Sequence, residues 1–214
     1  FRYTNSFKEA RFLRAYFYFN LVRAYGDVPY FTEMVTTDQV NSLTRTPAQE
    51  IFNAIIAECD KLSTELPADY TKLGLDGIAP AENGRVTCYA ALALKARAAL
   101  YAASPLFNPE NNKDLWRRAA EANKEVIETC TANGFKLSKY SELWGPNNWS
   151  NNEMIFVRRY NGNISTLEEY NFPMGVPGGN SGNCPTQNMV DAYEMKATGK
   201  MWNETGSGYD ASNP

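Results

Sequence analysis

The sequence contains no histidine, so the commonest general base and the commonest zinc ligand of proteins are both missing. This excludes a Ser-His-Asp or Cys-His catalytic site within these residues. The zinc motif H-E-x-x-H, the P-loop and the nucleophile motif G-x-S-x-G are absent as well.

A glycosidase needs two carboxylates that face each other across a cleft, but Glu168 and Glu169 are adjacent and would point apart on a strand. Asp191 and Glu194 would share one helix face and are expected to be exposed. We therefore expect no enzymatic activity, no cofactor and no metal site.

Basic charge and long hydrophobic runs are also scarce. The net charge is -3, which argues against a nucleic-acid partner, because nucleic-acid-binding surfaces are strongly basic. No apolar run reaches the roughly 18 residues of a membrane span, since Lys95 and Arg97 interrupt the longest candidate. The chain starts at Phe1 without an initiator methionine or a signal peptide, so we expect a fragment that begins inside a longer protein.

Cysteine is rare too, and the four cysteines are Cys59, Cys88, Cys130 and Cys184. None belongs to a C-x-x-C pair. The first three fall at apolar positions of helical patterns, which is typical of buried thiols. A disulfide is the alternative, and the sequence alone does not fix its pairing.

Aromatic residues, by contrast, make up 13 % of the chain, and many gather in the segment EARFLRAYFYFNLVRAYGDVPYF that begins at Glu9. At helical spacing this segment has two neighbouring apolar stripes: Ala10, Leu13, Phe17, Leu21 and Ala24 form the first, and Phe12, Tyr16 and Phe19 form the second. A helix with so wide an apolar surface packs against neighbours on more than one side. We therefore expect both stripes to be buried, and we expect the helix to end at Gly26.

Three further helices are predicted along the chain. One starts at TPAQE, where Thr46 and Gln49 would form a capping box, and it ends before Pro67. The next, TCYAALALKARAALYAA, is rich in alanine, whose small side chain lets a neighbouring helix approach closely. The fourth runs from about residue 114 to residue 133.

After these helices the composition changes to loops rich in asparagine, glycine and proline. NEMIFVRRY is predicted to be a short buried strand, and PTQNMVDAYEM is predicted to contain a short helix. Insertions at 27–45 and 68–83 separate the helices more widely than the ~34-residue period of tetratricopeptide repeats. We expect two domains: helical pairs with long insertions over residues 1–137, and an irregular ligand or partner region over residues 138–214.

Four segments resemble the SusD/RagB family in the same order: EARFLRAYFYFNLVRAYGDVPY, GRVTCYAALALKARAALYAASPLFN, NEMIFVRRY and PTQNMVDAYEM. The resemblance spans most of residues 6–200. It implies a mainly all-α fold, in which tetratricopeptide-like helix pairs form a right-handed superhelix with an irregular loop region and little sheet.

Proteins of this family are nutrient-binding lipoproteins of the outer membrane in gut-type Bacteroidetes. The resemblance implies that the chain binds an oligosaccharide or polysaccharide on the extracellular face and delivers it to a SusC-like TonB-dependent transporter. The membrane anchor would be a lipid on an N-terminal cysteine that this sequence does not include. Two alternatives stay open: a SusD-like protein that binds peptides, and a helical-repeat adaptor that binds only protein.

Ligand contacts vary across the family and have no fixed motif, so the site is predicted from chemistry alone. Aromatic rings cover the flat C–H faces of sugars, and polar side chains bind the rim of hydroxyls. The loops LWGPNNWSNNE and RRYNGN supply both kinds of group, and the candidates are Trp144, Asn147, Asn148, Trp149, Tyr160 and Asn161. For the two tryptophans the alternative is a structural role, in which the ring anchors its loop in the core. Trp202, near the end of the chain, stays unassigned.

Overall fold

The computed structural model describes residues 2–70, 84–143, 151–157 and 166–212. Contacts divide the chain into two compact units, Phe1–Arg159 and Tyr160–Pro214. The boundary predicted between residues 137 and 138, which separates the helical pairs from the irregular ligand or partner region, stays a prediction.

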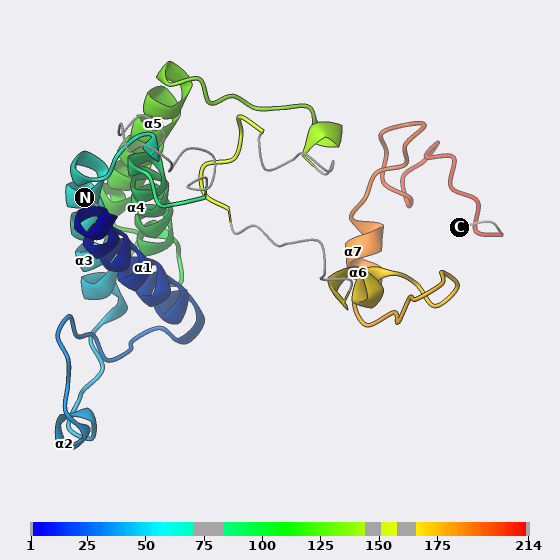
Figure 1. Cartoon of the computed structure of the whole chain (residues 1–214). Coiled ribbons are helices and arrows are strands. Elements are labelled where there is room, and N and C mark those ends of the chain that lie inside the picture. Colours follow the sequence, from blue (N-terminus) through cyan, green and yellow to red (C-terminus); the bar gives the residue numbers. More distant parts are fainter. Residues whose placement is uncertain (1, 71–83, 144–150, 158–165, 213–214) are drawn as a thin grey trace. The chain divides into compact units, whose positions relative to one another are not determined.

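The first unit is built from helices (Figure 1). The four long ones are α1 (Arg2–Tyr25), α3 (Ala48–Glu65), α4 (Cys88–Ala103) and α5 (Lys113–Ala132). The short helix α2 (Thr37–Val40) lies in the insertion between α1 and α3, and a single 3-10 turn, η3 (Tyr140–Glu142), follows α5. The described residues contain isolated β-bridges but no strand, so the predicted mainly helical fold is confirmed.

Consecutive long helices pack as antiparallel neighbours. Lys8, early in α1, donates a hydrogen bond of 2.7 Å from Nζ to the carbonyl oxygen of Glu65, the last residue of α3. Gln49, early in α3, donates from Nε2 to the carbonyl oxygen of Ala102 near the end of α4 (2.7 Å). Helix α4 in turn packs along α5. These contacts arrange the four long helices as antiparallel pairs, in agreement with the helical pairs predicted over residues 1–137.

Large side chains of α1 and α3 fill the centre of the core, and the least exposed are Phe12, Phe19, Val22, Ile51, Phe52, Ile55, Cys59 and Leu62. Helix α4 contributes mainly small residues, and its buried alanines are Ala90, Ala91, Ala96, Ala98, Ala99, Ala102 and Ala103. Because alanine occupies little volume, α4 packs tightly between α3 and α5. The predicted role of the alanine-rich helix is confirmed.

One prediction for α1 is wrong. The whole first stripe is exposed: Leu13 is 38 % and Phe17 is 59 % exposed, and Ala10, Leu21 and Ala24 are exposed as well. Phe12 and Phe19 of the second stripe are buried as predicted, whereas Tyr16 is 36 % exposed. The reason is that α1 contacts α3 and, more weakly, α4, so that only one side of the helix is covered.

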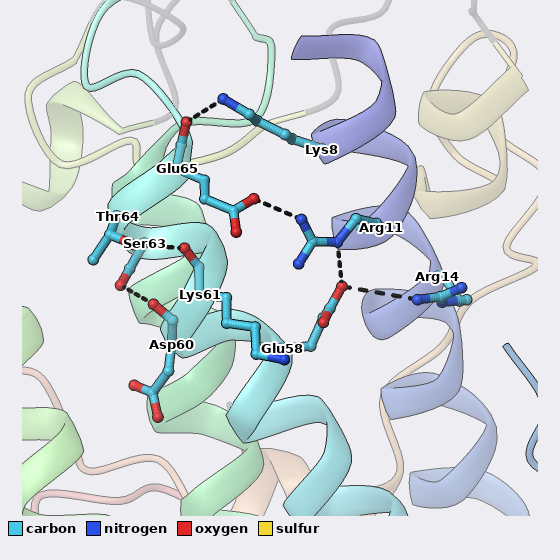
Figure 2. A network of polar contacts seen from close by, with 9 residues as sticks. All are labelled: Lys8, Arg11, Arg14, Glu58, Asp60, Lys61, Ser63, Thr64 and Glu65. Carbon is cyan, nitrogen blue, oxygen red and sulfur yellow. Dashed lines mark hydrogen bonds and ion pairs between the residues drawn. The ribbon is translucent and has the colours of Figure 1, made fainter. Parts of the chain in front are cut away.

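A charged network holds α1 against α3 (Figure 2). Arg11 lies between two carboxylates of α3: its Nε is 2.6 Å from Glu58 Oε1, and its Nη1 is 2.6 Å from Glu65 Oε2. Arg14 adds a longer contact of 3.8 Å to Glu58. The hydrogen bond that Arg11 donates to Glu58 raises the pKa of Arg11, although burial opposes this shift. Because the pairs are partly buried and one cation serves two anions, the network fixes the register of the two helices.

The predicted capping box at the start of α3 is also wrong. Thr46 forms a β-bridge with Val28. The first N–H of the helix, that of Ala48, donates a hydrogen bond to Asp27 Oδ1 instead (2.8 Å). The Gln49 side chain is engaged with α4 and cannot reach back to the cap. A true capping box occurs in α2, between Thr36 and Gln39.

The strand predicted in NEMIFVRRY is absent from its described part, which ends at residue 157. Among the residues that the structure describes, no strand lies beside this segment, and the Met154 N–H closes a turn onto the Asn151 carbonyl oxygen (3.0 Å). Phe156 packs edge-on against Phe12, with ring centroids 5.5 Å apart. The segment is therefore anchored by a side chain rather than by a sheet.

Cysteines in the structure carry free thiols, as predicted for buried positions. Cys59 is buried, and burial raises its pKa to about 12. Cys130 is also buried and Cys88 half-buried, and in both the pKa is raised by burial. Cys184 is exposed.

The second unit contains α6 (Thr166–Asn171) and α7 (Gln187–Asp191), and α7 confirms the short helix predicted in PTQNMVDAYEM. An antiparallel bridge between Glu194 and Met201 follows α7. Across the described ranges of both units, every helix is too short or too polar to cross a membrane.

Candidate ligand-binding site

The six site residues predicted from the sequence lie outside the described part of the chain: Trp144, Asn147, Asn148, Trp149, Tyr160 and Asn161. Their role in binding stays a prediction. Asn151, which belongs to the predicted loop LWGPNNWSNNE, is described and has a structural role. Its Oδ1 accepts hydrogen bonds from the Ser138 hydroxyl (2.6 Å) and from the Glu153 N–H (2.9 Å).

A hollow of about 660 Å³ lies within the second unit. Its walls come from α7, from the turn after α7 and from the loop near residue 210. Three aromatic rings and three carboxylates line it, together with other groups: Tyr193, Trp202 and Tyr209, and Asp191, Glu194 and Asp210. The volume falls in the usual range of small-ligand pockets.

The rings of Trp202 and Tyr209 form one apolar wall of this hollow. They meet nearly edge to face, with centroids 5.5 Å apart and an interplanar angle of 66°. Each residue is 39 % exposed, so the pair is held in place yet still offers apolar surface to solvent. Rings in this state provide a rigid contact surface for the C–H face of a ligand.

Ser207 organises the loop that carries these two rings. It is only 5 % exposed, and its hydroxyl donates to the Trp202 carbonyl oxygen (2.9 Å) and accepts from the Tyr209 N–H (3.2 Å). Gly206 and Gly208 on either side have φ of +77° and +79°, a conformation that glycine adopts at little cost. One buried hydroxyl thus ties together the backbone of both ring-bearing residues.

Two of the three carboxylates of the hollow, Asp191 and Asp210, are fixed by local hydrogen bonds. Asp191 Oδ1 accepts from Gln187 Nε2 one turn earlier in α7 (2.7 Å). Asp210 Oδ1 accepts from both the hydroxyl and the N–H of Ser212, and these bonds lower the pKa of Asp210. Glu194 forms an antiparallel bridge with Met201. Met201 directly precedes Trp202, so the bridge holds Glu194 close to Trp202.

Two details of this region differ from the sequence prediction. Helix α7 ends at Asp191, so Asp191 and Glu194 do not share a helix face. The bridge brings Glu194 to the hollow instead. Trp202 and Tyr209 were not predicted as site residues, although WNETGSGY combines rings with small polar residues in the same way as NNWSNN. The same compositional criterion would have selected them.

A second hollow, of about 340 Å³, lies within the first unit beside the start of α4. Its main polar groups are engaged with one another: Arg85 Nε donates to Glu9 Oε1 (3.0 Å), and the Tyr70 hydroxyl lies 2.9 Å from the same oxygen. The Arg85 guanidinium also stacks over the Tyr70 ring at 4.5 Å. These contacts stabilise the entry into α4.

Among the described residues, no group of three or more His, Cys, Asp or Glu side chains could hold a metal ion. The groups that the hollow of the second unit offers to a ligand are aromatic rings and carboxylate oxygens that accept hydrogen bonds. Such an arrangement can bind a ligand that has apolar faces and donating groups along its edge.

Comparison with known proteins points to one family. A family described as "Starch-binding associating with outer membrane", SusD-like, matches residues 2–100. A SusD-like carbohydrate-binding protein from Bacteroides fragilis NCTC 9343 has a similar solved structure, with a TM-score of 0.72 and 27 % identity over 94 % of this chain and 36 % of that one. The chain is similar to the SusD-like family, whose model matches residues 2–100. The resemblance found in the four sequence segments is thereby confirmed.

Other relatives agree with this assignment. A second SusD-like protein from Bacteroides fragilis gives a TM-score of 0.66 at 27 % identity, covering 91 % of this chain and 36 % of that chain. A SusD-like protein of Formosa agariphila is 25 % identical over 149 residues, which are 69 % of this chain and 24 % of that protein. The family description and the solved carbohydrate-binding relative name binding rather than catalysis, in agreement with the prediction that the SusD-like chain is not an enzyme. The chain spans about a quarter of its curated relative and about a third of the solved ones.

Proposed function

We propose that this SusD-like chain is part of a glycan-binding protein of the outer membrane and that the hollow of the second unit holds the glycan. The observation that carries the proposal is the placement of Trp202 and Tyr209 beside the carboxylates Asp191 and Glu194. A sugar has C–H faces that pack on rings and hydroxyls that donate to carboxylates, so both walls of the hollow would be used.

The family supports the same proposal. Its description as starch-binding agrees with a carbohydrate ligand, and one solved relative is named a carbohydrate-binding protein. The description also places the family at the outer membrane. We further propose that the whole protein is held by an N-terminal lipid on the extracellular face and delivers its ligand to a SusC-like TonB-dependent transporter.

Isothermal titration of the full-length protein against glycans and peptides tests the proposal. We expect Trp202→Ala to lower the affinity for the bound glycan by about tenfold or more, which corresponds to a loss of at least ~1.4 kcal/mol. Trp116→Ala is the matched control, because Trp116 lies outside the hollow and is similarly exposed at 37 %. Binding of peptides without any glycan would instead favour the peptide alternative, and equal affinities of both variants would contradict the assignment of the site.

A further inference from the structure

We infer that the hollow of the second unit takes an uncharged sugar chain and rejects sugars that carry carboxylate or sulfate groups. This inference rests on the proposed function and adds the chemical class of the ligand. Its starting point is the balance of charge in the described lining, where Asp191, Glu194 and Asp210 face a single cation, Lys196.

The carboxylates retain acceptor atoms that a ligand can use. Asp191 accepts the hydrogen bond from Gln187 at its Oδ1 atom. Asp210 accepts both hydrogen bonds from Ser212 at its own Oδ1 atom. Within the described part of the chain, the second oxygen of each carboxylate and both oxygens of Glu194 are bonded to no donor. These atoms are available to accept protons from sugar hydroxyls.

The charge of these acceptors decides between ligand classes. A hydroxyl donates to a carboxylate in a charge-assisted hydrogen bond, which is about twice as strong as a bond between neutral groups. A uronate or sulfate group has no proton to donate at neutral pH and would meet negative charges instead. Lys196 supplies one positive charge, and the described lining contains no arginine, the side chain best suited to bind carboxylates and sulfates in pairs.

The aromatic rings of the hollow also favour an uncharged sugar over an anionic one. The face of an aromatic ring carries partial negative charge, so it attracts the slightly positive C–H face of a sugar and repels an anion. Trp202 and Tyr209 form such a wall beside the carboxylates. The two walls therefore select against the same group, and the selection does not depend on any one residue.

A panel of oligosaccharides titrated into the full-length protein tests the inference. The neutral arm consists of malto-, xylo-, manno- and galacto-oligosaccharides, and the anionic arm consists of oligogalacturonate, oligoalginate and sulfated oligogalactan. We expect binding in the neutral arm only. Binding of any anionic oligosaccharide as tight as that of the best neutral one would overturn the inference while leaving glycan binding intact. Absence of binding in both arms would overturn the proposed function, and the inference with it.

Variants link the selectivity to the carboxylates. Glu194→Gln keeps the shape of the side chain and removes its charge, so the affinity for the neutral ligand should fall by about three- to tenfold. Asp191→Asn provides a second, independent test of the same effect. Glu204→Gln is the matched control, since Glu204 lies in the same unit and does not line the hollow. Undiminished affinity in both Glu194→Gln and Asp191→Asn would overturn the role of the charges.

Discussion

Replacing Phe19 by alanine should destabilise the helical unit strongly, whereas the same replacement at Phe17 should change its stability little. Both residues lie in α1, two positions apart, and both are phenylalanines. Phe19 is 1 % exposed and packs against Phe52 and Tyr101, with ring centroids 6.4 Å and 5.2 Å away. Phe17 is 59 % exposed. The pair therefore compares one side chain in two environments of the same helix.

The expected magnitudes follow from burial. Removing a buried phenylalanine ring costs about 3–5 kcal/mol, because the lost transfer free energy adds to the cost of the cavity. At Phe17 less than half of the side chain is covered, and no enclosed cavity forms, so the loss should be about 1 kcal/mol or less. A difference of at least ~2 kcal/mol between the variants is the quantity to be measured.

Urea unfolding followed by far-UV circular dichroism measures this difference through the helices of the first unit. With a urea m-value of about 2 kcal/mol/M, Phe19→Ala should lower the midpoint by roughly 1.5–2.5 M, and Phe17→Ala by roughly 0.5 M or less. Comparable losses in both variants would refute the reasoning, since they would show that the outer stripe of α1 is buried after all.

Three other predictions concern single side chains. In native protein, Cys184 should react with a thiol reagent well before Cys59, whose thiol is buried and has its pKa raised to about 12, as mass spectrometry of timed samples would show. Ser207→Ala should cost about 1–3 kcal/mol locally and speed amide exchange at Tyr209, and unchanged exchange would contradict the anchoring role of the hydroxyl. Trp149→Ala should lower glycan affinity by about tenfold with little change in melting temperature, whereas a loss of 3–5 kcal/mol of stability would assign Trp149 to the core.

Spacing and end signals predict the long helices well because they depend on nearby residues. Helix α1 ends at Tyr25, directly before the predicted Gly26, and α5 ends within a residue of the predicted stop. Periodicity also groups Leu13 with Phe17 on one face, and the structure keeps them together. It cannot tell whether another element covers that face, and this is why the burial of the first stripe was predicted wrongly.

Long-range bonds account for the other differences. The start of α3 is capped by Asp27, which lies 21 residues before Ala48. A local pattern at Thr46 and Gln49 fits a capping box equally well, but both residues are engaged elsewhere. A strand likewise needs a neighbouring strand to pair with. The apolar run before residue 158 instead packs its Phe156 ring against the Phe12 ring of α1. Sequence patterns therefore predict what a segment can form, while the available partners decide what it does form.

The candidate site also depends on contacts that the local sequence does not reveal. Composition alone treats Trp149 and Trp202 alike, because each is a large ring among small polar residues. A binding surface needs more than an exposed ring: the ring must be held so that little conformational entropy is lost when a ligand arrives. At Trp202 that requirement is met by the Ser207 hydroxyl, which joins the backbone of Trp202 to that of Tyr209 and brings the two rings to 5.5 Å. Serine is common in exposed loops, and only the fold reveals that this one is buried and bonded on both sides. A search for further sites of this kind should therefore look for buried polar anchors beneath pairs of rings rather than for the rings themselves.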